Sequence, residues 1–163
     1  MWRSFTPAIS WNSSEVRCEV VPLPCVAQMV RSPLPFRNAI NSGTLDLASV
    51  TLTTTAAPSS LLDTDTTNGL QMVIDKCSQA WTEAGTAPAY TYTCGGTSSS
   101  VLASRAVIGN NLTLSNLGST TAGATDHLRV TLTLPSGAGN TLQNQSSTIT
   151  YAFTGTQRAA TNK

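Results

Sequence analysis

The 163-residue chain carries a formal net charge of +1, and only 10% of its residues are charged, against the ~25% usual in globular domains. Its 40% of hydrophobic residues suffices for one domain with a real core, while nine scattered Lys and Arg residues exclude a nucleic-acid-binding surface. No run approaches the ~20 apolar residues that a membrane-spanning helix needs. The place of charged residues is taken by Thr, Ser, Asn, Gly and Ala. A surface of such neutral residues favours a secreted or cell-surface protein.

The first 37 residues are expected to form an irregular leader. Residues 1–37 show no sustained period and hold four Pro residues between Pro22 and Pro35, which cannot donate main-chain hydrogen bonds to a neighbouring strand. They also show no signal peptide, because the charged start is not followed by an apolar core and a cleavage site. We expect either a wrongly started reading frame or a divergent leader, and we assign no role to Cys18 or Cys25.

From residue 38 to residue 163 the sequence is rich in Thr and alternates between apolar and polar residues. Residues 128–134 are the clearest case, with Leu and Val on one face and Arg and Thr on the other. The same period recurs in shorter form at residues 44–52, 70–75, 90–94, 112–114 and 148–154. Gly and Asn turn signals separate these segments. The pattern predicts a single all-β domain over 38–163, with at most a turn or two of helix at 77–85 or 98–106.

The apolar faces of the two clearest segments are expected to share one core. The predicted members of this core are Leu128, Val130, Leu132, Leu134, Ile149, Tyr151 and Phe153. Many short strands separated by turns are typical of a sandwich or a barrel.

Few residues could carry catalysis or hold a metal. His127 is the one histidine, and a zinc site needs three or four ligands, so we interpret it as a polar residue at a sheet edge. Asp63, Asp65 and Asn68-Gly69 partly match a calcium-binding loop, but the later ligand positions hold Thr67 and Ile74. We interpret this segment as a polar turn. We expect no enzyme activity and no cofactor.

Cys77 and Cys94 flank a segment that contains Trp81, and both lie near the ends of predicted strands. In an oxidising compartment a disulfide bond between them would add roughly 3 kcal/mol of stability by the loop-entropy estimate. A pair of buried free thiols is the alternative. The extracellular character of the composition favours the disulfide.

Several motifs together resemble the TasA/camelysin-like family of secreted bacterial proteins, in particular its actinobacterial members. Residues 41–47, Asn-Ser-Gly-Thr-Leu-Asp-Leu, are similar to the family's entry strand. Residues 126–135, 139–144 and 147–157 are similar to its closing segment, and 68–94 to its middle part. The resemblance covers about three quarters of the chain.

The resemblance implies a jelly-roll-like antiparallel sandwich, secretion, and a place in biofilm-matrix or surface fibres. In such fibres an N-terminal strand of one subunit completes the sheet of the next, which implies self-association. The implied assembly edge lies at Thr44, Leu45, Asp46 and Leu47. The metalloprotease activity attributed to some members is not expected, because the chain offers no ligand set for it.

A monomeric secreted binding module for cell-wall polysaccharide is the alternative function. It predicts that Trp81, Tyr90 or Tyr92 is presented to solvent as a contact surface for the wall. The burial of these aromatic side chains therefore separates the two hypotheses.

Overall fold

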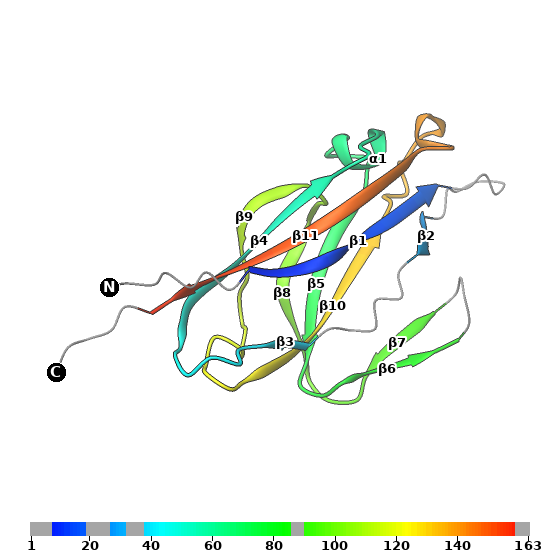
Figure 1. The fold of residues 1–163 in the computed structure, drawn as a ribbon. Helices are drawn as coiled ribbons and strands as arrows, with labels where there is room; N and C mark the ends of the chain where they lie inside the picture. Colours follow the sequence, from blue (N-terminus) through cyan, green and yellow to red (C-terminus); the bar gives the residue numbers. More distant parts are fainter. Residues whose placement is uncertain (1–7, 19–26, 32–37, 86–89, 159–163) are drawn as a thin grey trace.

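Antiparallel strands dominate the computed structural model, which describes residues 8–18, 27–31, 38–85 and 90–158, with 8–18, 27–31 and residue 38 described by backbone alone. The first sheet has the order β2-β1-β11-β4-β9. Its strands are β1 (Ala8–Cys18), β2 (Ala27–Arg31), β4 (Leu47–Ala56), β9 (Gly109–Thr113) and β11 (Ser146–Gln157). Figure 1 shows this sheet packed against a second one.

The second sheet has the order β3-β10-β5-β8. Its strands are β3 (Asn38–Ile40), β5 (Gln71–Cys77), β8 (Ser98–Ala106) and β10 (Thr125–Thr133). A separate hairpin pairs β6 (Trp81–Ala84) with β7 (Thr91–Cys94), and the helical elements of the described residues are α1 (Leu61–Thr64) and the 3-10 turn η1 (Asn140–Leu142). The fold is therefore an all-β antiparallel sandwich with little helix, as the sequence predicts.

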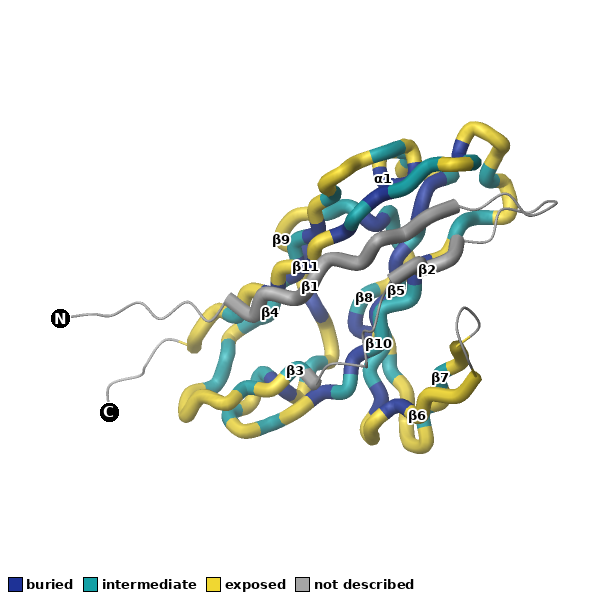
Figure 2. The backbone as a smooth tube through the Cα atoms, turned by 45° about the vertical axis from the view of Figure 1, so that its right-hand side comes forward, coloured by how far each residue is buried: buried dark blue, intermediate teal, exposed yellow. Residues whose placement is uncertain are grey.

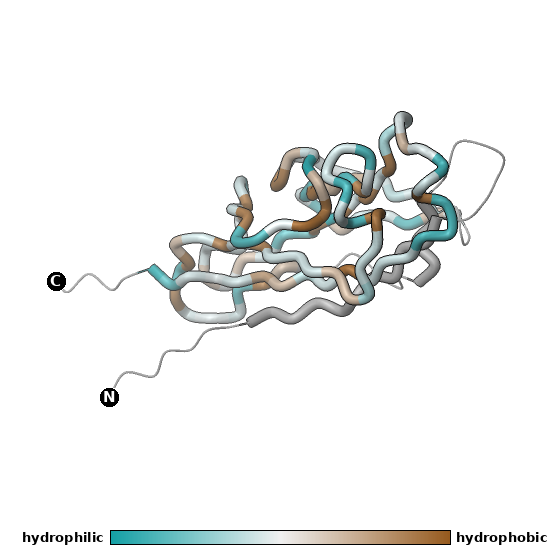
Figure 3. The backbone as a smooth tube through the Cα atoms, turned by 90° about the horizontal axis from the view of Figure 1, so that it is seen from above, coloured by the Kyte–Doolittle hydropathy of each residue, from teal (hydrophilic) through white to brown (hydrophobic). Residues whose placement is uncertain are grey.

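One hydrophobic core lies between the two sheets, and strand alternation builds it. Leu128 and Leu132 of β10 and Ile149, Tyr151 and Phe153 of β11 are all buried in it. Two further predicted members, Val130 and Leu134, are partly buried and pack against it. Figure 2 shows buried positions on strands of both sheets, and Figure 3 shows hydrophobic stretches interspersed with more polar ones along the backbone. The predicted core is confirmed.

The N-terminal segment differs from the irregular leader that the sequence suggests. Strand β1 pairs with β11 from Ala8 opposite Thr154 to Arg17 opposite Ser146, and β2 pairs with the other side of β1. A register shift between Trp11 and Ser14 breaks the alternation of β1, which is why no period of two is visible there. The proline residues of this segment lie in 1–7, 19–26 and 32–37, outside the described residues.

The two segments considered for short helices are strands instead. Residues 98–106 form β8, which pairs along β5, and residues 77–85 span the end of β5 and all of β6. Helix propensity is a weak preference that tertiary pairing overrides. Here the edge of β5 supplies the partner.

Candidate assembly site

Strand β11 is the longest described strand, and it has a partner on each side. Strand β4 pairs with it from Ala56 opposite Ile149 to Leu47 opposite Gln157. Strand β1 covers the other side over residues 146–154. Without β1, the body formed by residues 38–158 would expose the main-chain edge of β11, so this N-terminal strand completes the sheet.

The sequence-predicted assembly edge is not an open sheet edge. Thr44, Leu45 and Asp46 lie in the loop between β3 and β4, and Leu47 is the first residue of β4. The Leu47 N–H donates to the Thr120 carbonyl at 2.7 Å. The Asp46 carbonyl accepts from the Arg158 N–H at 3.0 Å. These two main-chain groups therefore already have partners within the chain. The role of residues 44–47 in assembly stays a prediction.

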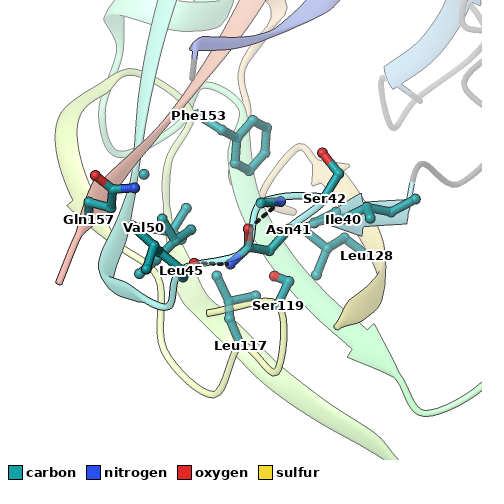
Figure 4. A pocket seen from close by; sticks show the side chains of 14 residues that line it. Ile40, Asn41, Ser42, Leu45, Val50, Leu117, Ser119, Leu128, Phe153 and Gln157 are labelled. Carbon is teal, nitrogen blue, oxygen red and sulfur yellow. Dashed lines mark hydrogen bonds between the residues drawn. The ribbon is translucent and has the colours of Figure 1, made fainter. Parts of the chain in front are cut away.

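Two of these residues instead line an apolar groove of about 330 Å³ at the end of the sandwich. The apolar lining comes from both sheets and the adjoining loops: Ala39, Ile40, Leu45, Leu47, Val50, Leu117, Leu128 and Phe153. Figure 4 shows Phe153, Leu128, Leu117 and Leu45 arranged around the groove. Leu45 is 55% exposed and Ile40 is 49% exposed, so the rim offers apolar surface to solvent.

Asn41 fixes the loop that forms one wall of the groove. Its side-chain amide donates to the Leu45 carbonyl at 3.1 Å, and its side-chain oxygen accepts from the Gly43 N–H at 3.1 Å (Figure 4). Its main-chain carbonyl accepts from the Gly123 N–H at 2.8 Å. The loop therefore holds its shape through local hydrogen bonds, and the groove is preformed.

The groove and one end of the ladder between β1 and β11 lie at the same end of β11. Ala8 is the first residue of β1 and lies opposite Thr154. The next residues of β11 toward its C-terminal end include Gly155 and Gln157, and both line the groove. The residues of β11 that line the groove therefore lie next to those that pair with β1.

Asp126 holds the loop that carries Ser119, which is one of the residues lining the groove. Its carboxylate accepts from the Ser119 N–H at 2.7 Å and the Gly118 N–H at 3.1 Å, and Lys76 Nζ lies at 3.3 Å. Burial by itself raises the pKa of Asp126, but the hydrogen bonds from Ser119 and Gly118 and the charge of Lys76 lower it by more. The pKa therefore lies below its ordinary value. The sequence gives no sign of this role, since the strand alternation does not show that Asp126 meets the loop at Gly118 and Ser119 or the distant Lys76.

The predicted bond between Cys77 and Cys94 is present, with the two Cα atoms 5.7 Å apart. It joins the end of β5 to the end of the hairpin. Trp81 on the hairpin is only 9% exposed, whereas Tyr90 is 45% exposed. The aromatic residues that the sequence grouped together therefore lie in different environments.

The remaining candidate residues have structural partners. The main-chain oxygen of His127 accepts from the Trp81 indole N–H at 2.9 Å. Asp63 accepts from the Ser60 N–H at 2.7 Å and completes the capping box of α1. Asp65 accepts from the N–H groups of Thr67 and Asn68, both at 2.9 Å, which forms the expected polar turn. Among the described residues no group of three or more His, Cys, Asp or Glu could hold a metal ion.

In the part of the chain that the structure describes, no helix is both long and apolar enough to cross a membrane. No family model, curated protein or solved structure matches the chain. The resemblance to the TasA/camelysin-like family therefore stays a prediction that rests on the motifs of the sequence.

Proposed function

We propose that the protein is a secreted structural subunit that assembles into surface or biofilm-matrix fibres by strand addition, with the jelly-roll connectivity of the TasA/camelysin-like family. The observation that carries this proposal is the main-chain pairing of the N-terminal strand β1 with β11. In a fibre, β1 of one subunit pairs with β11 of the next and forms the same ladder. Exchange of an identical element between copies costs little, because each hydrogen bond that is lost is formed again.

The groove and the composition support the same proposal. The apolar side chains of Ile40 and Leu45 at the rim of the groove would be covered by the neighbouring copy. A formal net charge of +1 leaves little repulsion between copies. The alternative, a monomeric binding module, needs Trp81, Tyr90 or Tyr92 at the surface, and the buried Trp81 gives it no support.

Locking β1 onto its own β11 tests the proposal. Ser10 and Ala152 lie directly opposite each other in the ladder, so the double variant Ser10→Cys/Ala152→Cys can be oxidised to fix β1 in place. We expect the oxidised variant to remain monomeric by light scattering and electron microscopy. Reduction should restore fibres.

The matched control places the second cysteine on the other side of β11. Thr53 of β4 lies opposite the same Ala152, so Thr53→Cys/Ala152→Cys joins two strands and leaves β1 free to exchange. This control should assemble under oxidising conditions. If the variant locked through Ser10 assembles as well as the control, β1 exchange does not build the fibre and the proposal is wrong.

A further inference from the structure

The hairpin of β6 and β7 carries a row of aromatic side chains on one face. Its register places Trp81 opposite Cys94 and Glu83 opposite Tyr92. Because residues two apart on a strand share a face, Tyr90, which directly precedes β7, lies on this face as well. The described residues of the hairpin are mostly exposed, in contrast to the sandwich behind it (Figure 2).

The base of the hairpin is fixed to the sandwich. Trp81 donates its indole N–H to the His127 carbonyl at 2.9 Å, and the Arg129 guanidinium lies 4.2 Å from the centre of its ring. The bond between Cys77 and Cys94 joins the hairpin to β5. Trp81 therefore acts as an anchor, and it holds the more distal part of the hairpin in a defined place.

Beyond this anchor, the exposed Tyr90 and the partly buried Tyr92 lie next to each other, and we call these two rings the platform. The ring centres of Tyr90 and Tyr92 lie 6.5 Å apart with an angle of 35° between the ring planes. Burial raises the pKa of Tyr92 to about 12, and the hydrogen bond and the negative charge of Glu83 contribute. The phenol of Tyr92 thus stays neutral at physiological pH.

The charges around the platform select against an anionic ligand. The Arg129 guanidinium is paired with the Asp75 carboxylate at 3.1 Å, which offsets its positive charge. Glu83 adds a negative charge beside Tyr92. A ligand that suits this surface is uncharged. It has flat apolar faces that can stack on the tyrosine rings and hydroxyl groups that can donate to the Glu83 carboxylate. Sugar rings have these properties, since their C–H groups form apolar faces and their hydroxyls form the rim.

We propose that this hairpin is a binding site for a neutral polysaccharide, with Tyr90 and Tyr92 stacking against sugar rings and Glu83 accepting a sugar hydroxyl. A protein partner is less favoured, because a protein interface needs a wider apolar centre than two rings. The site lies on the hairpin, away from the β1–β11 seam, and it does not depend on fibre assembly.

Affinity electrophoresis of the full chain tests the site. Native gels contain hydroxyethylcellulose, glucomannan or a soluble β-1,3-glucan, and a gel with alginate serves as the anionic comparison. We expect retardation by at least one neutral polysaccharide and none by alginate. Tyr90→Ala should weaken the association roughly tenfold, as the loss of a central aromatic contact does, whereas Tyr90→Phe should retain most of it.

Thr82→Ala is the matched control, because Thr82 lies on the opposite face of the same hairpin. It should bind as the parent does. The melting temperature of Tyr90→Ala should match that of the parent, since the side chain is exposed. Glu83→Gln preserves the shape of the side chain and gives a second test, and this variant should also bind the polysaccharide more weakly. The proposal is overturned if no neutral polysaccharide retards the parent, or if the Tyr90→Ala and Glu83→Gln variants are retarded as strongly as the control. The variant locked through Ser10 and Ala152 should bind normally, which separates this site from assembly.

Discussion

Two residues of β10 are held in place by different forces. Leu132 is buried among apolar side chains of both sheets. Asp126 is also buried, but three polar partners satisfy its carboxylate. The alternation of the sequence predicts the burial of Leu132, whereas the partners of Asp126 are visible only in the folded chain.

Leu132→Ala should lower the free energy of unfolding by about 2–5 kcal/mol, the range for removing a buried Leu side chain and leaving a cavity. Leu132 is 8% exposed and belongs to the main core. Urea unfolding monitored by circular dichroism measures the change. A loss within about 0.5 kcal/mol, as expected of a surface site, would show that the assigned face of β10 is wrong.

Asp126→Asn should destabilise the protein at neutral pH by about 1.5–3 kcal/mol, because hydrogen bonds to a charged group are lost. The pKa of Asp126 is lowered in the folded state, so its contribution is fully present above the ordinary carboxyl pKa and is lost as the pH falls through the folded value. The difference between parent and variant should therefore shrink below about pH 4.

Unfolding curves recorded between pH 7 and pH 2 measure this effect. Asp46→Asn is the control, because it also removes one carboxylate, but from a half-exposed pair with Arg158 at 3.7 Å. If the two variants show the same dependence on pH, the buried network around Asp126 does not stabilise the fold in the way described.

Strand β1 is an element whose position the sequence does not predict. Its register shift hides the alternation, and the prolines nearby suggest a leader without strands. The main chain of β11 nevertheless offers a long edge, and β1 pairs with it at eight residue positions. Strand pairing depends on main-chain N–H and C=O groups, and every residue except Pro supplies both. The pairing of β1 with β11 therefore leaves no pattern of residue types in the sequence.

Deletion of residues 1–37 should therefore lower the stability of the protein by more than about 3 kcal/mol, because each lost main-chain hydrogen bond contributes about 0.5–1.5 kcal/mol. The sequence alone suggests the opposite, that this deletion changes little. Deletion of residues 1–7 leaves all of β1 and serves as the control. Equal melting temperatures for both truncated chains and the parent would mean that β1 does not contribute to the sheet.

At the scale of the whole molecule, exposed leucine side chains among the described residues lie at two separate places on the sandwich. Leu45 lies at the rim of the groove, and Leu61 lies on α1, which Figure 1 shows at the other end of the strands. Leu61 is 46% exposed, close to the value for Leu45. The pair therefore allows the groove to be tested against a surface of similar exposure.

Leu45→Asp should slow fibre growth and leave the unfolding free energy nearly unchanged, because the new charge lies on a surface that neighbouring copies would cover. Leu61→Asp should assemble at the rate of the parent. Thioflavin fluorescence and light scattering follow the growth, and thermal unfolding checks the fold. Equal rates of fibre growth for the two variants would show that the groove is not part of the interface between copies.

The sequence by itself determined the all-β class, the strands over 128–134 and 148–154, the core face that they share and the pairing of Cys77 with Cys94. These features follow from the alternation of apolar and polar residues and from the placement of the cysteines near strand ends. Both signals can be read from short stretches of sequence. Only the tertiary structure decided that β1 completes the first sheet, that Leu45 and Leu47 line a groove, and that Trp81 anchors a hairpin. The physical reason is that these features depend on contacts between segments that are far apart in the sequence. Local residue patterns do not specify which distant strand edges or side chains come into contact.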